Sequence, residues 1–195
     1  MHKQFLKKLS RTFRRPILKE VQGIFTHLTD DEKIQLYKLS RSINRTAVCV
    51  EIGSYLGASS VLLAKGLRSG VLYCIDTWEN DAMTEGRRNT YEEFEQNTEI
   101  YSHKIIPTRG WSSNVFAEIA SKVEKIDLFF IDGDHSYEAV KKDWQLYSAL
   151  LTKGSIVIFH DYGWADGVQR VIKENVVDCI EQYHTLPNMW WGVMK

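Results

Sequence analysis

Apolar positions along the chain follow two alternating patterns. Short, nearly continuous apolar runs predict buried strands, and they occur at 47–52, 71–75, 103–107, 126–131 and 154–159. Segments with apolar residues every three or four positions predict helices, and they occur at 58–68, 89–99, 113–122, 137–150 and 166–175. Because strands and helices alternate, the pattern predicts an α/β fold with a parallel sheet that helices cover on both faces.

Two segments lie outside this alternation. The capping signature Thr29-Asp30-Asp31-Glu32 begins a helix expected over 29–43, lying over the sheet edge or the mouth of a ligand site. Residues 178–195 carry two more strand-like pieces around the turn Leu186-Pro187-Asn188. The chain shows no repeat and no second domain. We therefore predict one domain over 29–195, preceded by an N-terminal arm over 1–28.

The composition is that of a soluble globular protein. The 195 residues are 44% hydrophobic and 26% charged, which suits one α/β domain with a full core. No apolar run reaches the length of a membrane span. Cys49, Cys74 and Cys179 lie in apolar, strand-like settings without a C-x-x-C pair. We expect three reduced core cysteines and a cytoplasmic protein.

The first 20 residues carry the charge asymmetry of the chain. They hold seven basic residues and one acidic residue, so their net charge is +6 and that of the remainder is −6. An acidic domain binds nucleic acid poorly, so no nucleic-acid partner is expected. Apolar residues at helical spacing make this segment a basic amphipathic arm. Three roles stay open: packing in a homo-oligomer, peripheral membrane contact, or a transit peptide.

A glycine loop follows the first predicted strand. Residues 51–59 read Glu-Ile-Gly-Ser-Tyr-Leu-Gly-Ala-Ser, between a strand and a helix, as at the start of a nucleotide-binding βαβ unit. A dinucleotide fingerprint needs glycine at positions that Tyr55 and Ala58 occupy, so the loop does not indicate an NAD-dependent oxidoreductase. An acid before G-x-x-x-G suits a ligand with its own ammonium and carboxylate, such as S-adenosylmethionine (SAM). The alternative is a plain turn with packing glycines.

Two later strand ends carry candidate ligand contacts. Asp76 ends the second strand, where an acid is placed to accept hydrogen bonds from ribose hydroxyls. After the third strand, Trp111 is placed to stack on an adenine and Ser112 to bond its edge. Ser112 has an alternative reading as the N-cap of the helix at 113–122, and Asp76 as an ordinary cap or turn residue.

The strongest catalytic signal lies at the ends of the fourth and fifth strands. Asp132 follows one strand, and His160 and Asp161 follow the other. Because the carboxyl ends of neighbouring parallel strands meet at one sheet edge, these three side chains form a candidate divalent-cation site. His135, just before the next helix, is a candidate general base. The alternatives are two separate helix caps and histidines that face solvent.

With these residues placed, the chain resembles the class I SAM-dependent methyltransferases, and within them the metal-dependent small-molecule O-methyltransferases of the catechol and antibiotic-sugar types. The resemblance runs over about 47–162. It implies a doubly wound, Rossmann-like sheet of seven strands whose last strand, around 190–194, is inserted antiparallel. The loop at 51–59 closely follows the family form E-hydrophobic-G-x-Y-x-G-x-S.

The resemblance also implies roles for individual residues. Glu51, Gly53, Tyr55, Gly57 and Ser59 fall on the part of the family loop that holds the methionine end of SAM. Asp76 falls on the ribose-binding acid and Ser112 on the adenine-contacting serine, beside Trp111. Asp132 falls on the first metal ligand and His160 and Asp161 on the second and third, with His135 at the base position. The departure is His160, where those relatives usually carry a carboxylate.

The expected function is therefore transfer of a methyl group from SAM to a hydroxyl of a small molecule, such as a sugar, a phenol or another natural product. A divalent cation, Mg²⁺ or Mn²⁺, would assist. We expect the aromatic and polar residues of 77–100, which include Trp78, to cap the acceptor pocket together with Tyr162 and Trp164. For any single one of these residues, the alternative is a place in an ordinary surface loop. The alternative is a non-catalytic SAM-fold module that recruits partners through the basic arm.

Overall fold

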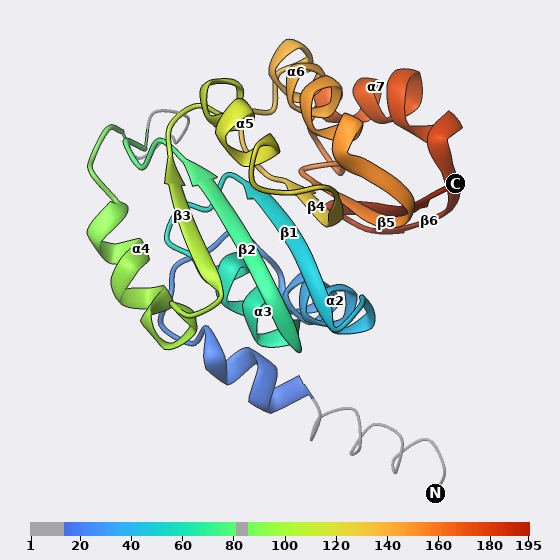
Figure 1. The fold of residues 1–195 in the computed structure, drawn as a ribbon. Coiled ribbons are helices and arrows are strands. Elements are labelled where there is room, and N and C mark those ends of the chain that lie inside the picture. Colours follow the sequence, from blue (N-terminus) through green and yellow to red (C-terminus); the bar gives the residue numbers. More distant parts are fainter. Residues whose placement is uncertain (1–13, 81–85) are drawn as a thin grey trace, which may run out of the picture.

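The computed structural model describes residues 14–80 and 86–195. Residues 14–20 are helical. The alternation of strands and helices then follows as predicted (Figure 1), in the order α2 (Asp30–Ser42), β1 (Thr46–Ile52), α3 (Ala58–Gly66), β2 (Ser69–Asp76), α4 (Tyr91–Thr98), β3 (Ile105–Arg109), α5 (Ser112–Ala120), β4 (Ile126–Ile131), α6 (Tyr137–Tyr147), β5 (Leu151–His160), α7 (Asp166–Val171), β6 (Ile180–Leu186) and β7 (Met189–Met194).

The strands form one seven-stranded sheet in the order β3-β2-β1-β4-β5-β7-β6. The pairs β1–β2, β1–β4, β2–β3 and β4–β5 are parallel. The last strand, β7, is antiparallel to both β5 and β6, between which it is inserted. This topology confirms the predicted doubly wound sheet with an antiparallel last strand. The order reverses at β1, between β2 and β4, which is where ligands bind in such sheets.

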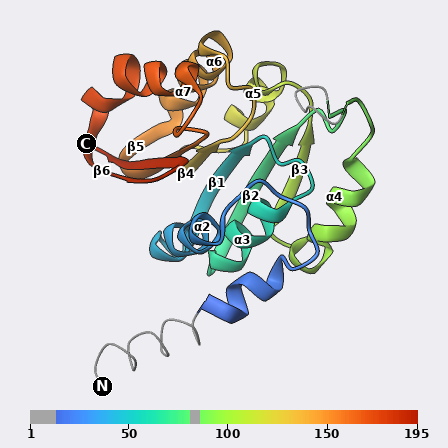
Figure 2. The same cartoon turned by 180° about the vertical axis from the view of Figure 1, so that it is seen from behind.

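Helices cover both faces of the sheet, as the apolar strands require. Figures 1 and 2 show α2, α3 and α4 on one face and α5, α6 and α7 on the other. Each face has its own apolar core, the first containing Leu36, Leu62 and Phe94 and the second containing Ile119, Trp144 and Val168. All six residues of β4 are buried. Because burial on both faces produces a nearly continuous apolar run, the predicted bounds of this strand match the observed ones.

The predicted helix at 29–43 is α2. Its capping box is present in full, because the Thr29 side chain accepts from the Glu32 amide and the Glu32 carboxylate accepts from the Thr29 amide. The helix packs on α3 over one face of the sheet, where Gly66 of α3 lies so close to Ser40 and Tyr37 that a Cβ atom would clash. Its first turn points Glu32 toward the end of β5, a contact described below.

The part of the predicted arm that the structure describes packs against the domain. Ile17 and Val21 are buried in the apolar core under α3, and Leu28 joins the same core. Glu20 bonds the Lys65 ammonium at 2.7 Å and the Tyr101 hydroxyl at 2.6 Å. Residues 1–13, with the first part of the apolar stripe, lie outside the described residues. The boundary of the arm at residue 28 stays a prediction.

Two expectations about single residues were wrong. Cys179 is exposed, unlike the buried Cys49 and Cys74, because it lies in a short helical turn before the edge strand β6. Trp78 does not cap a pocket. It is fully buried against Tyr91 and Phe94, and its indole nitrogen donates to the Tyr55 carbonyl at 3.0 Å. Within 14–80 and 86–195, no helix combines the length and apolarity needed to cross a membrane.

Candidate functional site

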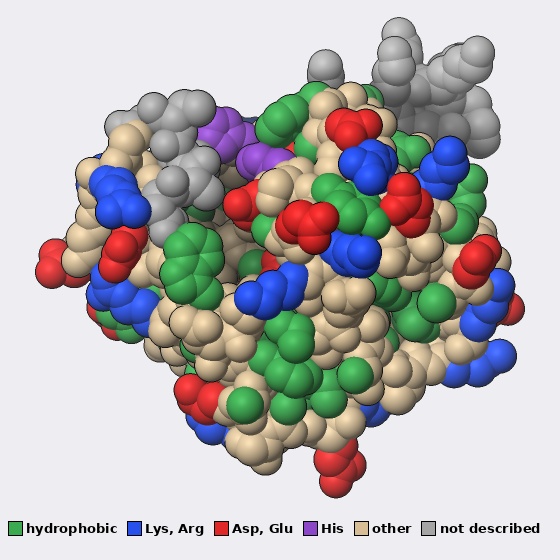
Figure 3. Space-filling model, turned by 90° about the horizontal axis from the view of Figure 1, so that it is seen from above, with side chains coloured by type: hydrophobic (Ala, Val, Ile, Leu, Met, Phe, Trp, Pro, Cys, Tyr) green, Lys and Arg blue, Asp and Glu red, His purple; other side chains and the backbone are tan. Residues whose placement is uncertain are grey.

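A cavity of about 760 Å³ opens at the carboxyl ends of the central strands. The loops after β1, β2, β3, β4 and β5 line it, together with residues 25–28 and Asn188. Figure 3 looks onto this face and shows a hollow with histidine and acidic side chains beside it. Of the cofactor residues predicted from the sequence, the cavity lining includes Gly53, Tyr55, Ser59, Asp76, Trp111 and Ser112.

The glycine loop lies directly against the end of β4. Gly53 has φ +87°, and a Cβ atom there would lie 2.0 Å from the backbone oxygen of Asp132. Only glycine fits, so the loop and the first predicted metal ligand are held together through the backbone. Tyr55, at φ +45°, is a non-glycine residue in the left-handed region. Strain of this kind is concentrated at functional sites.

Asp76 connects the glycine loop to the segment after β2. One carboxylate oxygen accepts the Tyr55 amide at 2.8 Å and the other accepts the Trp78 amide at 2.7 Å. The side chain therefore positions the loop as well as facing the cavity. A ribose hydroxyl would bond to the remaining acceptor positions of these two oxygens.

Two predicted cofactor residues do not line the cavity. Glu51 is completely buried beneath the loop, where Ser60 donates to its carboxylate, and burial raises the pKa of Glu51. Gly57 has φ +88° and packs against Thr98 and Phe94 at the start of α3. Both residues shape the loop from below, and their contact with a cofactor stays a prediction.

Ser112 does not cap a helix. It is the first residue of α5, whose N-cap position is Trp111, and its hydroxyl donates to the carboxylate of Asp143 on α6. Asp143 also lines the cavity, and burial raises its pKa to about 6. Sequence reasoning missed Asp143, because it lies inside an amphipathic helix. Trp111 is 56% exposed beside this pair, at the wall where an adenine is expected.

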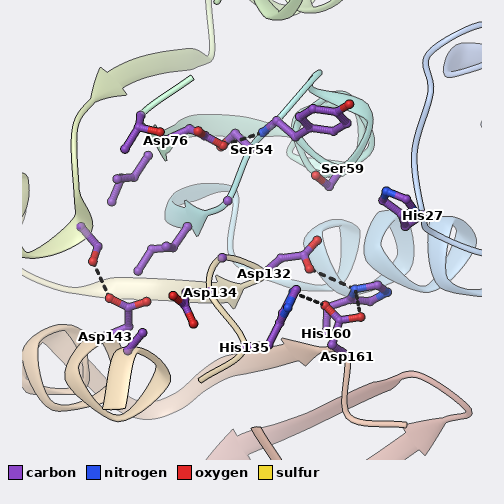
Figure 4. Close-up of a pocket in the computed structure, with 18 of the residues that line it drawn as sticks. His27, Ser54, Ser59, Asp76, Asp132, Asp134, His135, Asp143, His160 and Asp161 are labelled. Atoms are coloured by element: carbon purple, nitrogen blue, oxygen red, sulfur yellow. Dashed lines mark hydrogen bonds and ion pairs between the residues drawn. The ribbon is translucent and has the colours of Figure 1, made fainter. Parts of the chain in front are cut away.

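The acidic and imidazole side chains predicted at the ends of β4 and β5 come together. Nδ1 of His160 lies 3.0 Å from Oδ1 of Asp132 and 3.3 Å from Oδ1 of Asp161. Nε2 of His135 lies 2.8 Å from Oδ2 of Asp161. Figure 4 shows these four side chains pointing toward one another, with Asp76 and Asp143 farther along the cavity. We call them the acid–imidazole cluster.

Asp161 is the centre of this cluster. Its carboxylate also accepts from the Trp164 indole at 2.8 Å and from the Asn188 amide at 3.0 Å. Its backbone has φ +58°, which the Trp164 and Ala165 amides hold by donating to the Asp161 carbonyl. These contacts direct the carboxylate between the two imidazoles. Asn188, from the turn before β7, is a further residue that the sequence pattern did not indicate.

Burial and charge act against each other in the acid–imidazole cluster. Burial alone would lower the pKa of His160, but the carboxylates of Asp132, Asp161 and Glu32 outweigh it and raise the pKa to about 12. Burial likewise would raise the pKa of Asp161, but its contacts with His135 and His160 hold it well below the ordinary range. Contact with Asp161 raises the pKa of His135 despite partial burial.

The acid–imidazole cluster fits a divalent cation. One ligand atom each from Asp132, His160 and Asp161 lies within 4.8 Å of the other two. Two carboxylates facing one imidazole nitrogen form a mixed donor set that suits Mn²⁺, Fe²⁺ or Zn²⁺ as well as Mg²⁺.

Comparison with known proteins identifies the family. A family model described as a methyltransferase domain matches residues 50–162. An uncharacterised protein of Acanthamoeba polyphaga mimivirus is 28% identical over 132 residues, which are 66% of this chain and 59% of that protein. An uncharacterised protein of Sinorhizobium fredii is 27% identical over 118 residues, which are 57% of this chain and 13% of that protein. The chain thus spans less than two thirds of the length of each of these two curated relatives.

Solved structures share the fold at low identity. An O-methyltransferase from Bacillus cereus, in complex with S-adenosylhomocysteine (SAH), has a TM-score of 0.69 at 16% identity, covering 94% of this chain and 91% of that chain. TomG from Streptomyces achromogenes, in complex with SAM, has a TM-score of 0.66 at 16% identity, covering 94% and 89%. MycE, in complex with Mg, SAH and mycinamycin VI, has a TM-score of 0.64 at 14% identity, covering 90% and 51%.

These findings agree with the topology and with the residues of the cavity. The family match runs from the last residues of β1 to just past the end of β5, the segment that supplies the glycine loop, Asp76 and the acid–imidazole cluster. Because this match extends over more than half of the sequence, the chain belongs to the methyltransferase-domain family.

Proposed function

We propose that the chain is a SAM-dependent O-methyltransferase that moves a methyl group to a hydroxyl of a small molecule, with the assistance of a divalent cation. One observation carries the proposal: a single cavity joins the glycine loop to the acid–imidazole cluster. A non-catalytic SAM-fold module would need the loop alone. The cluster buries charged groups at one end of the cavity, and such burial destabilises the folded protein. A protein that only binds SAM would gain nothing from it.

The cofactor would lie along the loop after β1. Gly53, Tyr55 and Ser59 would bind the methionine end, since the loop runs into the N-terminus of α3, which favours an anionic group. Asp76 would bind the ribose, and Trp111 and Ser112 would bind the adenine. Bound in this way, SAM supplies an electrophilic methyl group, and the protein aligns it with the acceptor oxygen.

The acceptor hydroxyl would lie beside the acid–imidazole cluster. Asp132, His160 and Asp161 would hold a cation, which when bound supplies Lewis-acid chemistry that lowers the pKa of a hydroxyl. His135 would take the hydroxyl proton. Its Nε2 faces Asp161 at 2.8 Å, so a neutral His135 that donates from Nε2 presents its lone pair at Nδ1. Its side chain is 35% exposed, which keeps it accessible to an acceptor.

The cavity mouth favours an acceptor with a flat or apolar face. Phe25 is 53% exposed on one side, next to His27, and Trp164 is 63% exposed on the other, packed edge-on against His135. Exposed aromatic rings around a polar centre suit sugars, phenols and larger natural products alike. The presence of mycinamycin VI with Mg and SAH in MycE supports an acceptor of the natural-product class.

Calorimetry followed by a transfer assay tests the proposal. The full chain is titrated with SAH and, for comparison, with NAD, and then incubated with radiolabelled SAM, Mn²⁺ or Mg²⁺, and a panel of sugars and phenols. We expect SAH to bind, NAD not to bind, and transfer to stop in excess EDTA while SAH binding persists. Absence of SAH binding at millimolar concentration contradicts the whole proposal, and full transfer in EDTA contradicts the role of the cation.

The location and assembly of the protein are separate proposals. We propose a cytoplasmic homo-oligomer in which the basic residues of 1–20 allow peripheral contact with an anionic membrane. Sizing chromatography and salt-dependent sedimentation with anionic liposomes test the two parts. A monomer on the sizing column contradicts the homo-oligomer. Liposome binding that persists in high salt contradicts an electrostatic origin of the membrane contact.

A further inference from the structure

Glu32 is buried next to the acid–imidazole cluster, although the sequence pattern indicates only that it caps the start of a helix. The residue is 1% exposed. Oε2 accepts the Thr29 amide at 2.8 Å and the Thr29 hydroxyl at 2.7 Å, while Oε1 has no hydrogen-bond partner among the described residues. A capping box works equally well with a solvated glutamate. Burying a carboxylate with an unsatisfied oxygen is costly, so its position calls for another role.

Glu32 faces the nitrogen of His160 that points away from the cation site. Nδ1 of His160 faces Asp132 and Asp161, whereas Nε2 lies 3.7 Å from Oε2 of Glu32. An imidazole that ligates a cation through Nδ1 carries its proton on Nε2 and needs an acceptor there. The side chain that supplies that acceptor fixes the ring orientation and makes Nδ1 a stronger ligand.

Asn188, the other group near Nε2, offers a donor. Its Oδ1 accepts the Gly163 amide at 3.1 Å, and its Nδ2 donates to Asp161 at 3.0 Å. These bonds fix the amide so that Nδ2 lies 3.4 Å from Nε2 of His160. Of these two neighbours, Glu32 is therefore the one that can accept a proton from Nε2.

We propose that Glu32 is a positioning residue for the cation site, the outer carboxylate that accepts Nε2–H of His160 and thereby directs Nδ1 toward the cation shared with Asp132 and Asp161. The inference rests on the cation part of the proposed function. The 3.7 Å separation of Nε2 from Oε2 exceeds a hydrogen bond, so the inference requires these two atoms to approach each other when the proton of His160 resides on Nε2. The first turn of α2 is thus part of the site, although its sequence signature is that of an ordinary helix start.

The test compares two variants of the full chain. Glu32→Gln keeps the size of the side chain and the capping box, which glutamine also forms, but removes the charged acceptor. Thr29→Ala weakens the same helix start by removing the hydroxyl bond to Oε2 of Glu32, but it keeps the backbone amide bond of residue 29 and the charged carboxylate opposite His160. Mn²⁺ affinity is measured by electron paramagnetic resonance and SAH affinity by calorimetry without cation. We expect Glu32→Gln to weaken Mn²⁺ binding by about 10- to 100-fold. Thr29→Ala should stay within about threefold of wild type, and SAH affinity should not change in either variant.

A second measurement needs no variant. In ¹⁵N-labelled wild type loaded with Mg²⁺, long-range proton–nitrogen correlation should show His160 protonated at Nε2 only. Protonation at Nδ1 overturns the inference, as does a Glu32→Gln variant that binds Mn²⁺ like wild type. If Glu32→Gln and Thr29→Ala lose the same amount of Mn²⁺ affinity, the effect comes from helix capping, and this result overturns the inference too. Wild type that binds SAH but not Mn²⁺ overturns the cation site together with this inference, while the cofactor assignment stands.

Discussion

Nε2 of His135 lies 2.8 Å from Oδ2 of Asp161. The other oxygen of the same carboxylate faces His160 at 3.3 Å, so one side chain contacts both the candidate base and a candidate metal ligand. This arrangement means that the orientation of His135 depends on Asp161. It also means that substitutions of Asp161 change two functions at once, so the base is better tested by changing His135 itself.

Replacement of His135 by alanine should lower turnover by about 10²- to 10⁴-fold, the usual range for loss of a general base. Steady-state kinetics on an accepted hydroxyl substrate measure the effect. Mn²⁺ and SAH affinities, measured on the same protein, should stay near those of wild type. A loss below about threefold in His135→Ala shows that His135 is not the general base.

Asp76 should discriminate between SAH and an analogue that lacks the ribose hydroxyls. Its carboxylate also accepts two backbone amides, so Asp76→Ala disturbs the loop even without a ribose contact. The informative quantity is therefore the preference for SAH over the 2′,3′-dideoxy analogue. We expect wild type to show a preference of about 1.5–3 kcal/mol by calorimetry, the range for hydrogen bonds to a charged group. If Asp76→Ala prefers SAH over the dideoxy analogue as strongly as wild type does, Asp76 does not bind the ribose.

The pKa of Asp143 predicts a pH-dependent effect on stability. Burial raises this pKa from 3.8 to about 6 in the folded protein. A raised acid pKa favours the folded state below pH 3.8, and that contribution is lost as the pH rises through about 6. Asp143→Asn removes the charge and keeps a hydrogen-bond acceptor for Ser112. We expect the variant to exceed wild type in free energy of unfolding by about 3 kcal/mol at pH 8, and by roughly half of that at pH 5.

Thermal denaturation at both pH values measures this difference. For a chain of this length, 1 kcal/mol shifts the melting temperature by about 2–4 °C, so the expected gap is readily resolved. Asp178→Asn, at an exposed position, controls for the change in net charge. A gap between Asp143→Asn and wild type that does not grow with pH is inconsistent with a buried, neutralised carboxyl.

The fold could be predicted because its signals are local. Apolar runs and helical spacing located the strands and helices of the domain, and the predicted bounds differ from the observed bounds by only a few residues. The third strand was expected at 103–107 but runs over Ile105–Arg109, because a turn closed by the Lys104 amide on the Tyr101 carbonyl takes up the preceding residues. Turns of this kind have no apolar period, so the pattern did not separate them from the strand.

The candidate site was only partly predictable, because its members meet through the fold. Residues that directly follow strands, such as Asp132 and His160, could be placed at one edge from topology alone. Glu32, Asp143 and Asn188 lie within a helix cap, an amphipathic helix and a hairpin turn, where their residue types are ordinary. Trp78 was wrongly placed at the pocket, because an aromatic residue in a long loop was expected to face a ligand. Its indole instead donates to the Tyr55 backbone carbonyl in the core.

The segment at 14–21, which belongs to the predicted arm, gives the last prediction, because Ile17 and Val21 are buried in the apolar core. Ile17 is 3% exposed in the apolar core, while Lys19 on the same helix faces solvent. Ile17→Ala should lower the free energy of unfolding by about 2–4 kcal/mol through lost apolar burial and the cavity left behind. Lys19→Ala should change it by less than about 0.5 kcal/mol. Urea denaturation of both variants measures this. Similar stabilities would show that the segment at 14–21 is an accessory arm, whereas the expected difference shows that this segment contributes to the core of the domain.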